Sequence, residues 1–202
     1  MTTVFKKEAT MPTLYYVPMI HTPQELGILK DAFLDARMKM YGEKTTLAFL
    51  EEVKRYWHIV ERRIERAGLY HPEIASQSHI FIDSLPHTEE TLVMKIVQEL
   101  ILQKIPAYLI SKILLENGAT IHGTEDPDPL LQEHRYWKEI SQGKTPDPEK
   151  AQELLRRRDQ YIAQRIISVV PDEDLAVLFM GRLHDVVGII IQLSKKFTIV
   201  NL

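Results

Sequence analysis

Two histidines of this 202-residue chain follow short sequences of the same form, one near each end of the chain. His21 lies within residues 16–22 and His184 within residues 179–185, and each comes three positions after a turn-forming residue that ends an apolar run. Each histidine also stands where a helix is predicted to begin. Side chains at strand-to-helix turns of an α/β protein meet at the sheet edge that binds ligands, so the two imidazoles indicate a candidate active site.

The chemistry that suits this pair is metal binding or general base catalysis. A histidine at a helix N-terminus feels the positive end of the helix dipole, which favours neutral imidazole, the form that binds a metal or accepts a proton. The chain has no cysteine, so a metal would be held by His, Asp, Glu or water. We therefore expect His21 and His184 to hold divalent Mn, Co, Fe or Zn. The alternative is that each histidine only caps or packs at its turn.

Charged residues after other predicted strands would complete this site. Asp83 ends one predicted strand and Glu125 follows another, and the carboxyl ends of parallel strands share one edge of a sheet. We expect either carboxylate to be a further ligand or the base for a bound water, the alternative being a capping role. Arg158 ends a run of three arginines that cannot all face one side of a helix. Unless the whole run is solvated, we expect Arg158 to stabilise an oxyanion.

Three further polar residues follow predicted strands in a comparable way: His87, His122 and Asp185. Asp185 either orients the histidine that precedes it or caps the helix that follows. The two tryptophans, Trp57 and Trp137, lie on predicted helices. We expect them to be packing residues and not a platform for stacking nucleic-acid bases.

Short runs of β-forming residues alternate with amphipathic helical patterns along the chain. The predicted strands cover residues 14–17, 79–83, 119–122, 175–180 and 197–202, and the predicted helices cover residues 23–41, 45–67, 89–116, 129–140, 148–169 and 184–193. Thr22 is the expected N-cap of the first helix, with Glu25 completing a capping box, and Pro106 should kink or divide the third.

This alternation predicts an α/β fold with a largely parallel central sheet of about five strands flanked by helices. We expect a single domain over residues 1–202, with residues 1–13 loosely ordered. If the sheet has an antiparallel strand, we expect it to be the last one, at an edge of the sheet.

Composition argues against several classes of protein. The chain is 45% hydrophobic and 26% charged, as ordinary globular proteins are, and its net charge of −3 argues against a nucleic-acid-binding surface. The N-terminal residues contain no apolar signal segment. The most apolar stretch, residues 175–193, is interrupted by Arg182, His184 and Asp185. We therefore expect a cytoplasmic protein with no membrane or nucleic-acid partner.

Several of these segments, in this order, resemble motifs of the TraB/Tiki-like superfamily, which includes erythromycin-esterase-like and ChaN-like proteins. Residues 14–22 and 177–184 are similar to its two G-x-x-H motifs, and residues 121–125 to the strand that delivers its glutamate. Arg158 resembles its arginine, and Asp83 its acidic residue at a strand end. The resemblance spans most of the chain and implies an α/β fold and a divalent-metal hydrolase, although other members bind haem or cleave esters.

The chain departs from this pattern at two positions, and the departures bear on its function. Pro18 replaces the glycine of the first motif, and Arg182 places a cation inside the second. The leading hypothesis is a metal-dependent hydrolase of a peptide or ester bond, acting on a small-molecule or peptide substrate. One alternative is a non-catalytic protein that binds an anion or haem through Arg182 and the two histidines. Another is a structural subunit of a homo-oligomer that uses the apolar helix over residues 92–115.

Overall fold

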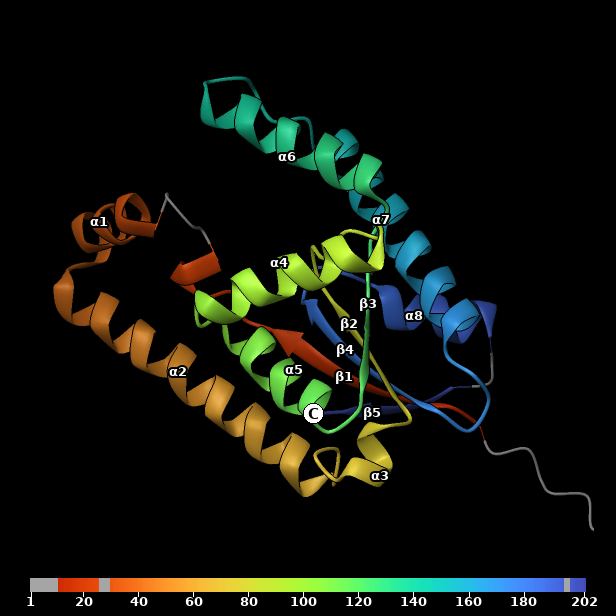
Figure 1. The fold of residues 1–202 in the computed structure, drawn as a ribbon. Coiled ribbons are helices and arrows are strands. Elements are labelled where there is room, and N and C mark those ends of the chain that lie inside the picture. The colour runs from red at the N-terminus through yellow and green to blue at the C-terminus, as the bar shows by residue number, and fades with distance from the viewer. Residues whose placement is uncertain (1–10, 26–29, 195–196) are drawn as a thin grey trace, which may run out of the picture.

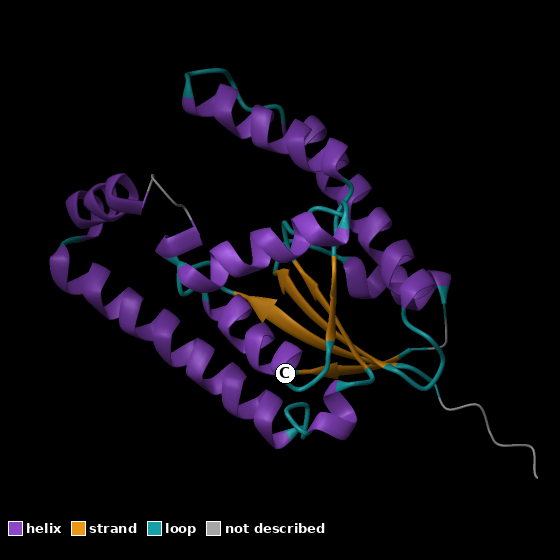
Figure 2. Ribbon diagram, viewed as in Figure 1, coloured by secondary structure: helices purple, strands orange, loops and turns teal. Residues whose placement is uncertain are grey.

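A computed structural model describes residues 11–25, 30–194 and 197–202. Five parallel strands form one central sheet with the order β3-β2-β4-β1-β5, and helices cover both of its faces (Figures 1 and 2). The strands are β1 (Thr13–Met19), β2 (Ser78–Ile82), β3 (Thr120–His122), β4 (Leu175–Gly181) and β5 (Thr198–Asn201). This confirms the predicted α/β fold with a parallel sheet.

The central strand β4 is buried along almost its whole length, between β2 and β1. Its continuous apolar sequence is typical of a parallel strand that is covered on both faces. Val177 and Phe179 belong to the core on one face, and Leu178 and Met180 to the core on the other. This alternation follows from the two-residue period of a strand.

Eight helices surround the sheet within the described residues. They are α1 (Lys30–Tyr41), α2 (Glu43–Arg66), α3 (Pro72–Ala75), α4 (Glu90–Leu102), α5 (Pro106–Glu116), α6 (Pro127–Ser141), α7 (Pro148–Val169) and α8 (Val186–Leu193). Buried residues of α2, α4 and α5 cover one face of the sheet, and those of α7 and α8 cover the other. Helix α6 packs on α7 and extends away from the sheet (Figure 1).

The strand register explains how the two similar sequences come together. β1 and β4 pair in parallel from Thr13 opposite Leu175 to Met19 opposite Gly181. The two strands therefore end side by side, and the histidines that follow them leave the sheet at the same edge.

Local differences from the predicted elements have simple causes. The turn after His21 is a short 3₁₀ segment over residues 23–25, and α1 begins only at Lys30. The rest of the predicted first helix, residues 26–29, lies outside the described residues. Pro106 divides the predicted third helix into α4 and α5 as expected, because it occupies the first turn of α5.

Both ends of the chain also differ from expectation. The last strand, β5, is an edge strand but runs parallel to β1, so the expectation of an antiparallel edge is wrong. Residues 1–10 of the segment predicted to be loosely ordered lie outside the described residues, and Thr13 already belongs to β1. None of the described helices combines the length and the apolar character needed to span a membrane.

The burial of β4 predicts a large difference between two leucines that are close in sequence. Leu178 is 0% exposed in the sheet, whereas Leu183 is 86% exposed in the loop that follows. Leu178→Ala should lower the free energy of unfolding by about 2–5 kcal/mol, because it leaves a cavity in the core. The control, Leu183→Ala, should change it by roughly 0.5 kcal/mol or less. Urea unfolding followed by circular dichroism measures both, and similar losses for the two variants would contradict the assignment of β4.

Candidate functional site

Three of the predicted site residues converge at the carboxyl edge of the sheet. His21 follows β1, Asp83 follows β2 and His184 follows β4, the strand that lies between the other two. One oxygen of the Asp83 carboxylate, Oδ2, lies 3.6 Å from Nε2 of His184 and 4.0 Å from Nε2 of His21. The two imidazoles therefore turn the same ring nitrogen toward one buried oxygen.

Gly181 makes this close approach possible. Its backbone N–H donates to Oδ2 of Asp83 at 3.0 Å. A Cβ atom at this position would lie 2.9 Å from the same oxygen and 3.5 Å from Nε2 of His21. The glycine of the second motif thus leaves space between the carboxylate and the imidazoles. Pro18, the departure in the first motif, lies within β1 and pairs with Met180, so it does not fill this space.

His184 is held by a carboxylate that the sequence analysis did not single out. Its Nδ1 lies 2.5 Å from Oδ1 of Asp159 on α7, and Oδ2 of Asp159 accepts the backbone N–H of Asp185 at 2.8 Å. Asp159, and not Asp185, thus binds the ring of His184, and Asp185 makes no side-chain cap for α8. The available signal was the position of Asp159, which directly follows Arg158 on the helix predicted to face the site.

His21 is held in the same way by a residue close to it in sequence. Its Nδ1 lies 2.6 Å from Oε2 of Glu25, whose other oxygen accepts the N–H and the hydroxyl of Thr22. Glu25 was predicted as the partner of Thr22 in a capping box, and it also orients the imidazole. The two histidines differ in exposure: the side chain of His21 is 57% exposed, and that of His184 is 7% exposed.

These carboxylates change the protonation of the histidines. The hydrogen bond that His21 donates to Glu25 raises the pKa of His21, although burial works in the opposite direction. Burial also lowers the pKa of His184, but the hydrogen bond with Asp159 and the charge of Asp83 outweigh it, and the net pKa is raised. The sequence analysis expected helix dipoles to favour neutral imidazole. The nearby carboxylates are the stronger influence, because they contact the rings directly.

Asp83 remains ionised although it is buried. Burial alone would raise its pKa, but the charges of His184 and Arg158 and the hydrogen bond from Gly181 lower it below the ordinary range. The site therefore places one buried, ionised carboxylate beside two imidazoles, and both imidazoles face the same oxygen of it.

Arg158 is buried beneath this group, at the centre of a cluster of carboxylates. It donates to both oxygens of Glu125 at 2.5 and 2.7 Å, to Oδ1 of Asp83 at 3.0 Å, and to Glu133 of α6. An arginine has five N–H donors, and most of them are taken up by these carboxylates. This arrangement favours a role for Arg158 in positioning Asp83 over the predicted role in stabilising an oxyanion.

Glu125 lies deeper than the predicted ligand or base role requires. It is 0% exposed, and besides Arg158 it accepts the backbone N–H of Ser84 at 2.5 Å. Burial raises its pKa, although Arg158 works against this effect. With both oxygens occupied, Glu125 acts on the site through Arg158 in this conformation.

The other predicted candidates lie apart from this group. His122 pairs with His79, and His87 pairs with Tyr161, on the side of the sheet edge near β3. Trp57 is buried as expected, with 4% exposure, and on α6 the ring of Tyr136 packs edge-on against that of Trp137, which is 53% exposed. Helix α6 extends away from the sheet, which leaves this residue uncovered.

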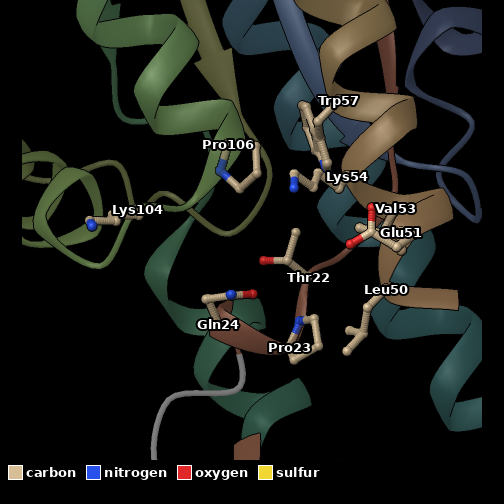
Figure 3. Close-up of a pocket in the computed structure, with 10 residues that line it drawn as sticks. All are labelled: Thr22, Pro23, Gln24, Leu50, Glu51, Val53, Lys54, Trp57, Lys104 and Pro106. Atoms are coloured by element: carbon tan, nitrogen blue, oxygen red, sulfur yellow. The ribbon is translucent and has the colours of Figure 1, made fainter. Parts of the chain in front are cut away.

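A cavity of about 320 Å³ lies beside the turn that follows His21, and Thr22 and Pro23 line it (Figure 3). It lies between the turn that begins at Thr22, the helix α2 and the start of α5. Its wall is mainly apolar, with Leu50, Val53, Trp57 and the prolines 23 and 106, and the lysines 54 and 104 also line it. Trp57 donates to the carbonyl of Ile20, which ties this wall to the turn that carries His21.

The donor atoms at the sheet edge are of types that bind a transition metal, but not all the distances between them match those between metal ligands. Two imidazole nitrogens and one carboxylate oxygen form a set that Mn, Co, Fe or Zn accepts. Within residues 11–25, 30–194 and 197–202, no three His, Asp or Glu side chains are arranged to hold a metal ion as they stand. Metal bonds of about 2.0–2.2 Å place neighbouring ligand atoms roughly 3.3–3.6 Å apart. The separation of His184 from Asp83 meets this spacing, and that of His21, at 4.0 Å, exceeds it.

Comparison of this chain with models of known families, with curated proteins and with solved structures gives no match.

The hydrogen bond between Asp159 and His184 can be tested by titration. In Asp159→Asn, His184 loses the anionic partner that raises its pKa and remains buried, so its pKa should fall below the wild-type value. A histidine with a raised folded-state pKa stabilises the fold below its unfolded pKa, and this contribution is lost as the pH rises through the folded value. The variant should therefore lose stability mainly at low pH. NMR titration of the histidine rings measures the pKa, and Asp185→Asn is the control that should leave it unchanged.

The Arg158 cluster predicts a second, opposite dependence on pH. Arg158→Met leaves Glu125 buried without its cation, which should cost about 3–5 kcal/mol of the free energy of unfolding. The pKa of Glu125 should rise further, so the folded state binds its proton more tightly than the unfolded state does, and the loss should shrink as the pH falls. Unfolding in urea at several pH values measures this. Arg157→Met, a change at the exposed neighbour, should have little effect, and equal losses in both variants would contradict the cluster.

Proposed function

We propose that this protein is a divalent-metal-dependent hydrolase that cleaves a peptide or ester bond at the site formed by His21, Asp83 and His184. One observation carries the proposal: each histidine binds a carboxylate through Nδ1 and turns Nε2 toward the same oxygen of Asp83. Carboxylates orient metal-ligating histidines in this way in metalloproteins. The resemblance of the two histidine sequences to the G-x-x-H motifs of the TraB/Tiki-like superfamily supports it.

The residues of the site divide into ligands and groups that position them. His21, His184 and Asp83 would hold the metal, and a metal at such a site acidifies a bound water and polarises a carbonyl group. Asp159 and Glu25 fix the Nδ1 side of each imidazole, so Nε2 is the nitrogen available to a ligand. Most of the adjustment would fall on His21, because it is more exposed than His184.

The Arg158 cluster would hold Asp83 in place during the reaction. Asp83 Oδ1 is bound by Arg158 and by the hydroxyl of Ser84, and this leaves Oδ2 to face the imidazoles. A carboxylate held on one oxygen keeps the other at a fixed position, which is the preorganisation that catalysis requires. Glu125 contributes by fixing Arg158.

The surroundings of the site support an anionic or polar group of the substrate near β1 and β4. Arg182 is exposed, and its charge acts on the phenol groups of Tyr16 and Tyr56. We assign to Arg182 the contact with an oxyanion that the sequence analysis assigned to Arg158. The apolar cavity beside Thr22 (Figure 3) would hold a hydrophobic side chain of a peptide or the apolar part of an ester.

A non-catalytic protein that binds an anion or haem at this place is the second candidate. The exposed cation of Arg182 and the raised pKa values of His21 and His184 favour it, because all three groups would attract an anion. In that case ligand binding would persist in protein stripped of metal, and no bond would be cleaved.

A structural role as a homo-oligomer subunit has weaker support. Helices α4 and α5 bury residues such as Val93, Val97 and Leu114 in the core, and leave Leu92 and Leu102 exposed. The apolar character that motivated this alternative is thus largely explained by the core.

A cytoplasmic location also remains a prediction.

The proposal is tested by metal analysis and hydrolysis assays on the same preparations. Wild-type protein purified without chelators should carry near-stoichiometric Mn, Fe, Co or Zn by mass spectrometry, and should cleave model peptides or esters. The double variant His21→Ala/His184→Ala should lose the metal and the cleavage, because it removes both imidazole ligands. The control is His58→Ala/His134→Ala, which removes two exposed histidines elsewhere. Equal metal content in the two double variants, or cleavage that persists in a chelator, would contradict the proposal.

A further inference from the structure

A polar cavity of about 270 Å³, separate from the apolar one beside Thr22, lies at the β3 side of the sheet edge. Three basic side chains line it: His87 from the loop after β2, His122 at the end of β3, and Arg165 from α7. Thr88, just before α4, and Glu90 and Val93 in its first turn close the cavity. None of the residues that line it belongs to the candidate hydrolytic site.

Arg165 points a largely unused guanidinium at this cavity wall. Its recorded contact is a donation from Nε to the backbone carbonyl of Gly123 at 3.4 Å. The carboxylates of Asp83, Glu125 and Glu133 pair with Arg158, and that of Asp174 pairs with His79. The hydrogen bond of Arg165 to Gly123 uses only Nε, so its Nη groups keep their donor capacity.

The two histidines are fixed by partners outside the cavity. Nε2 of His122 lies 2.9 Å from Nδ1 of His79, whose other nitrogen lies 2.9 Å from Asp174. The ring of His122 also stacks on Phe81 and His79. Nδ1 of His87 lies 2.5 Å from the hydroxyl of Tyr161. Each imidazole therefore keeps one ring nitrogen available to a ligand: Nδ1 in His122 and Nε2 in His87.

Backbone contact holds the cavity in this shape. A Cβ atom on Gly123 would lie 2.5 Å from Cα of His87 and 2.5 Å from the carbonyl oxygen of Pro86. Only glycine lets the two loops approach so closely. His87 also donates its backbone N–H to the carbonyl of Glu125. The positions of His87 and His122 are thus coupled through the main chain.

Among the residues that line the cavity, Arg165 carries the permanent positive charge, and the two histidines have lowered pKa values. Burial and the neighbouring His79, Arg165 and His87 lower the pKa of His122 to about 4. Burial and Arg165 also lower the pKa of His87, with Asp126 as a weaker opposing charge. Among the described residues, the carboxylate of Glu90 lies at the cavity wall and that of Asp174 lies beyond His79.

We propose that this cavity binds a phosphoryl group, either free phosphate or a small phosphomonoester, through Arg165, His122 and His87. Arg165 supplies the positive charge that an oxyanion needs and binds phosphoryl oxygens through paired N–H donors, while each neutral imidazole can donate one N–H. A tetrahedral group has oxygens for donors that come from three separate elements. The cavity volume lies below the range of about 300–1,000 Å³ that holds drug-sized ligands, so the ligand is small.

Calorimetric titration of the whole protein with inorganic phosphate, methyl phosphate and acetate tests this proposal. Phosphate or methyl phosphate should bind in a saturable way and more tightly than acetate, and the tighter of the two phosphates identifies the source. Arg165→Gln should weaken binding roughly tenfold or more, because it removes charge-assisted hydrogen bonds. Arg165→Lys should retain more of the affinity. Urea unfolding verifies that both variants fold.

Two controls separate this cavity from other binding. Arg157→Gln removes the same charge from an exposed position of α7, and His184→Gln changes the hydrolytic site. Neither should alter phosphate affinity. Absence of saturable phosphate binding, acetate binding as tight as phosphate, or equal losses in Arg157→Gln and Arg165→Gln would overturn the proposal. The readout does not require hydrolytic activity.

Discussion

The buried ion cluster around Arg158 is the interaction on which the arrangement of the site depends. Arg158 belongs to α7, and its three carboxylate partners come from the end of β2, the loop after β3 and α6. Buried charges are stable only when each has its partners, so the four elements must meet in one geometry. The cluster fixes the position of Asp83, and the other oxygen of Asp83 faces the two imidazoles.

The two histidines show how one geometry arises from a local and a distant contact. His21 is oriented by Glu25, four residues later in the chain. His184 is oriented by Asp159, from a helix that precedes it by a whole strand and loop. The local pair is exposed and the distant pair is buried. Buried pairs are held by the packing around them, whereas exposed pairs are weakened by water. The site therefore has one rigid imidazole and one that can adjust.

Much of the fold was predictable because its signals are local. The apolar run of β4, the division of the long helix at Pro106 and the turn after β1 follow from strand patterning, proline stereochemistry and helix capping. His21, Asp83 and His184 were also predictable as neighbours, because residues after parallel strands share one edge. The direction of β5 was not predictable, because it depends on the pairing of β5 with β1, and that pairing depends on which edge of the sheet is free.

By itself, the sequence determined the alternation of strands and helices, the parallel sheet and the residues that follow its strands. These features depend on periodicity and on short-range stereochemistry. Only the tertiary structure decided that Asp159 binds His184, that carboxylates occupy Arg158, and that His122 faces a separate cavity with Arg165. The physical reason is that these contacts join residues far apart in the chain. Their partners are selected by strand order and helix packing, which no single segment encodes.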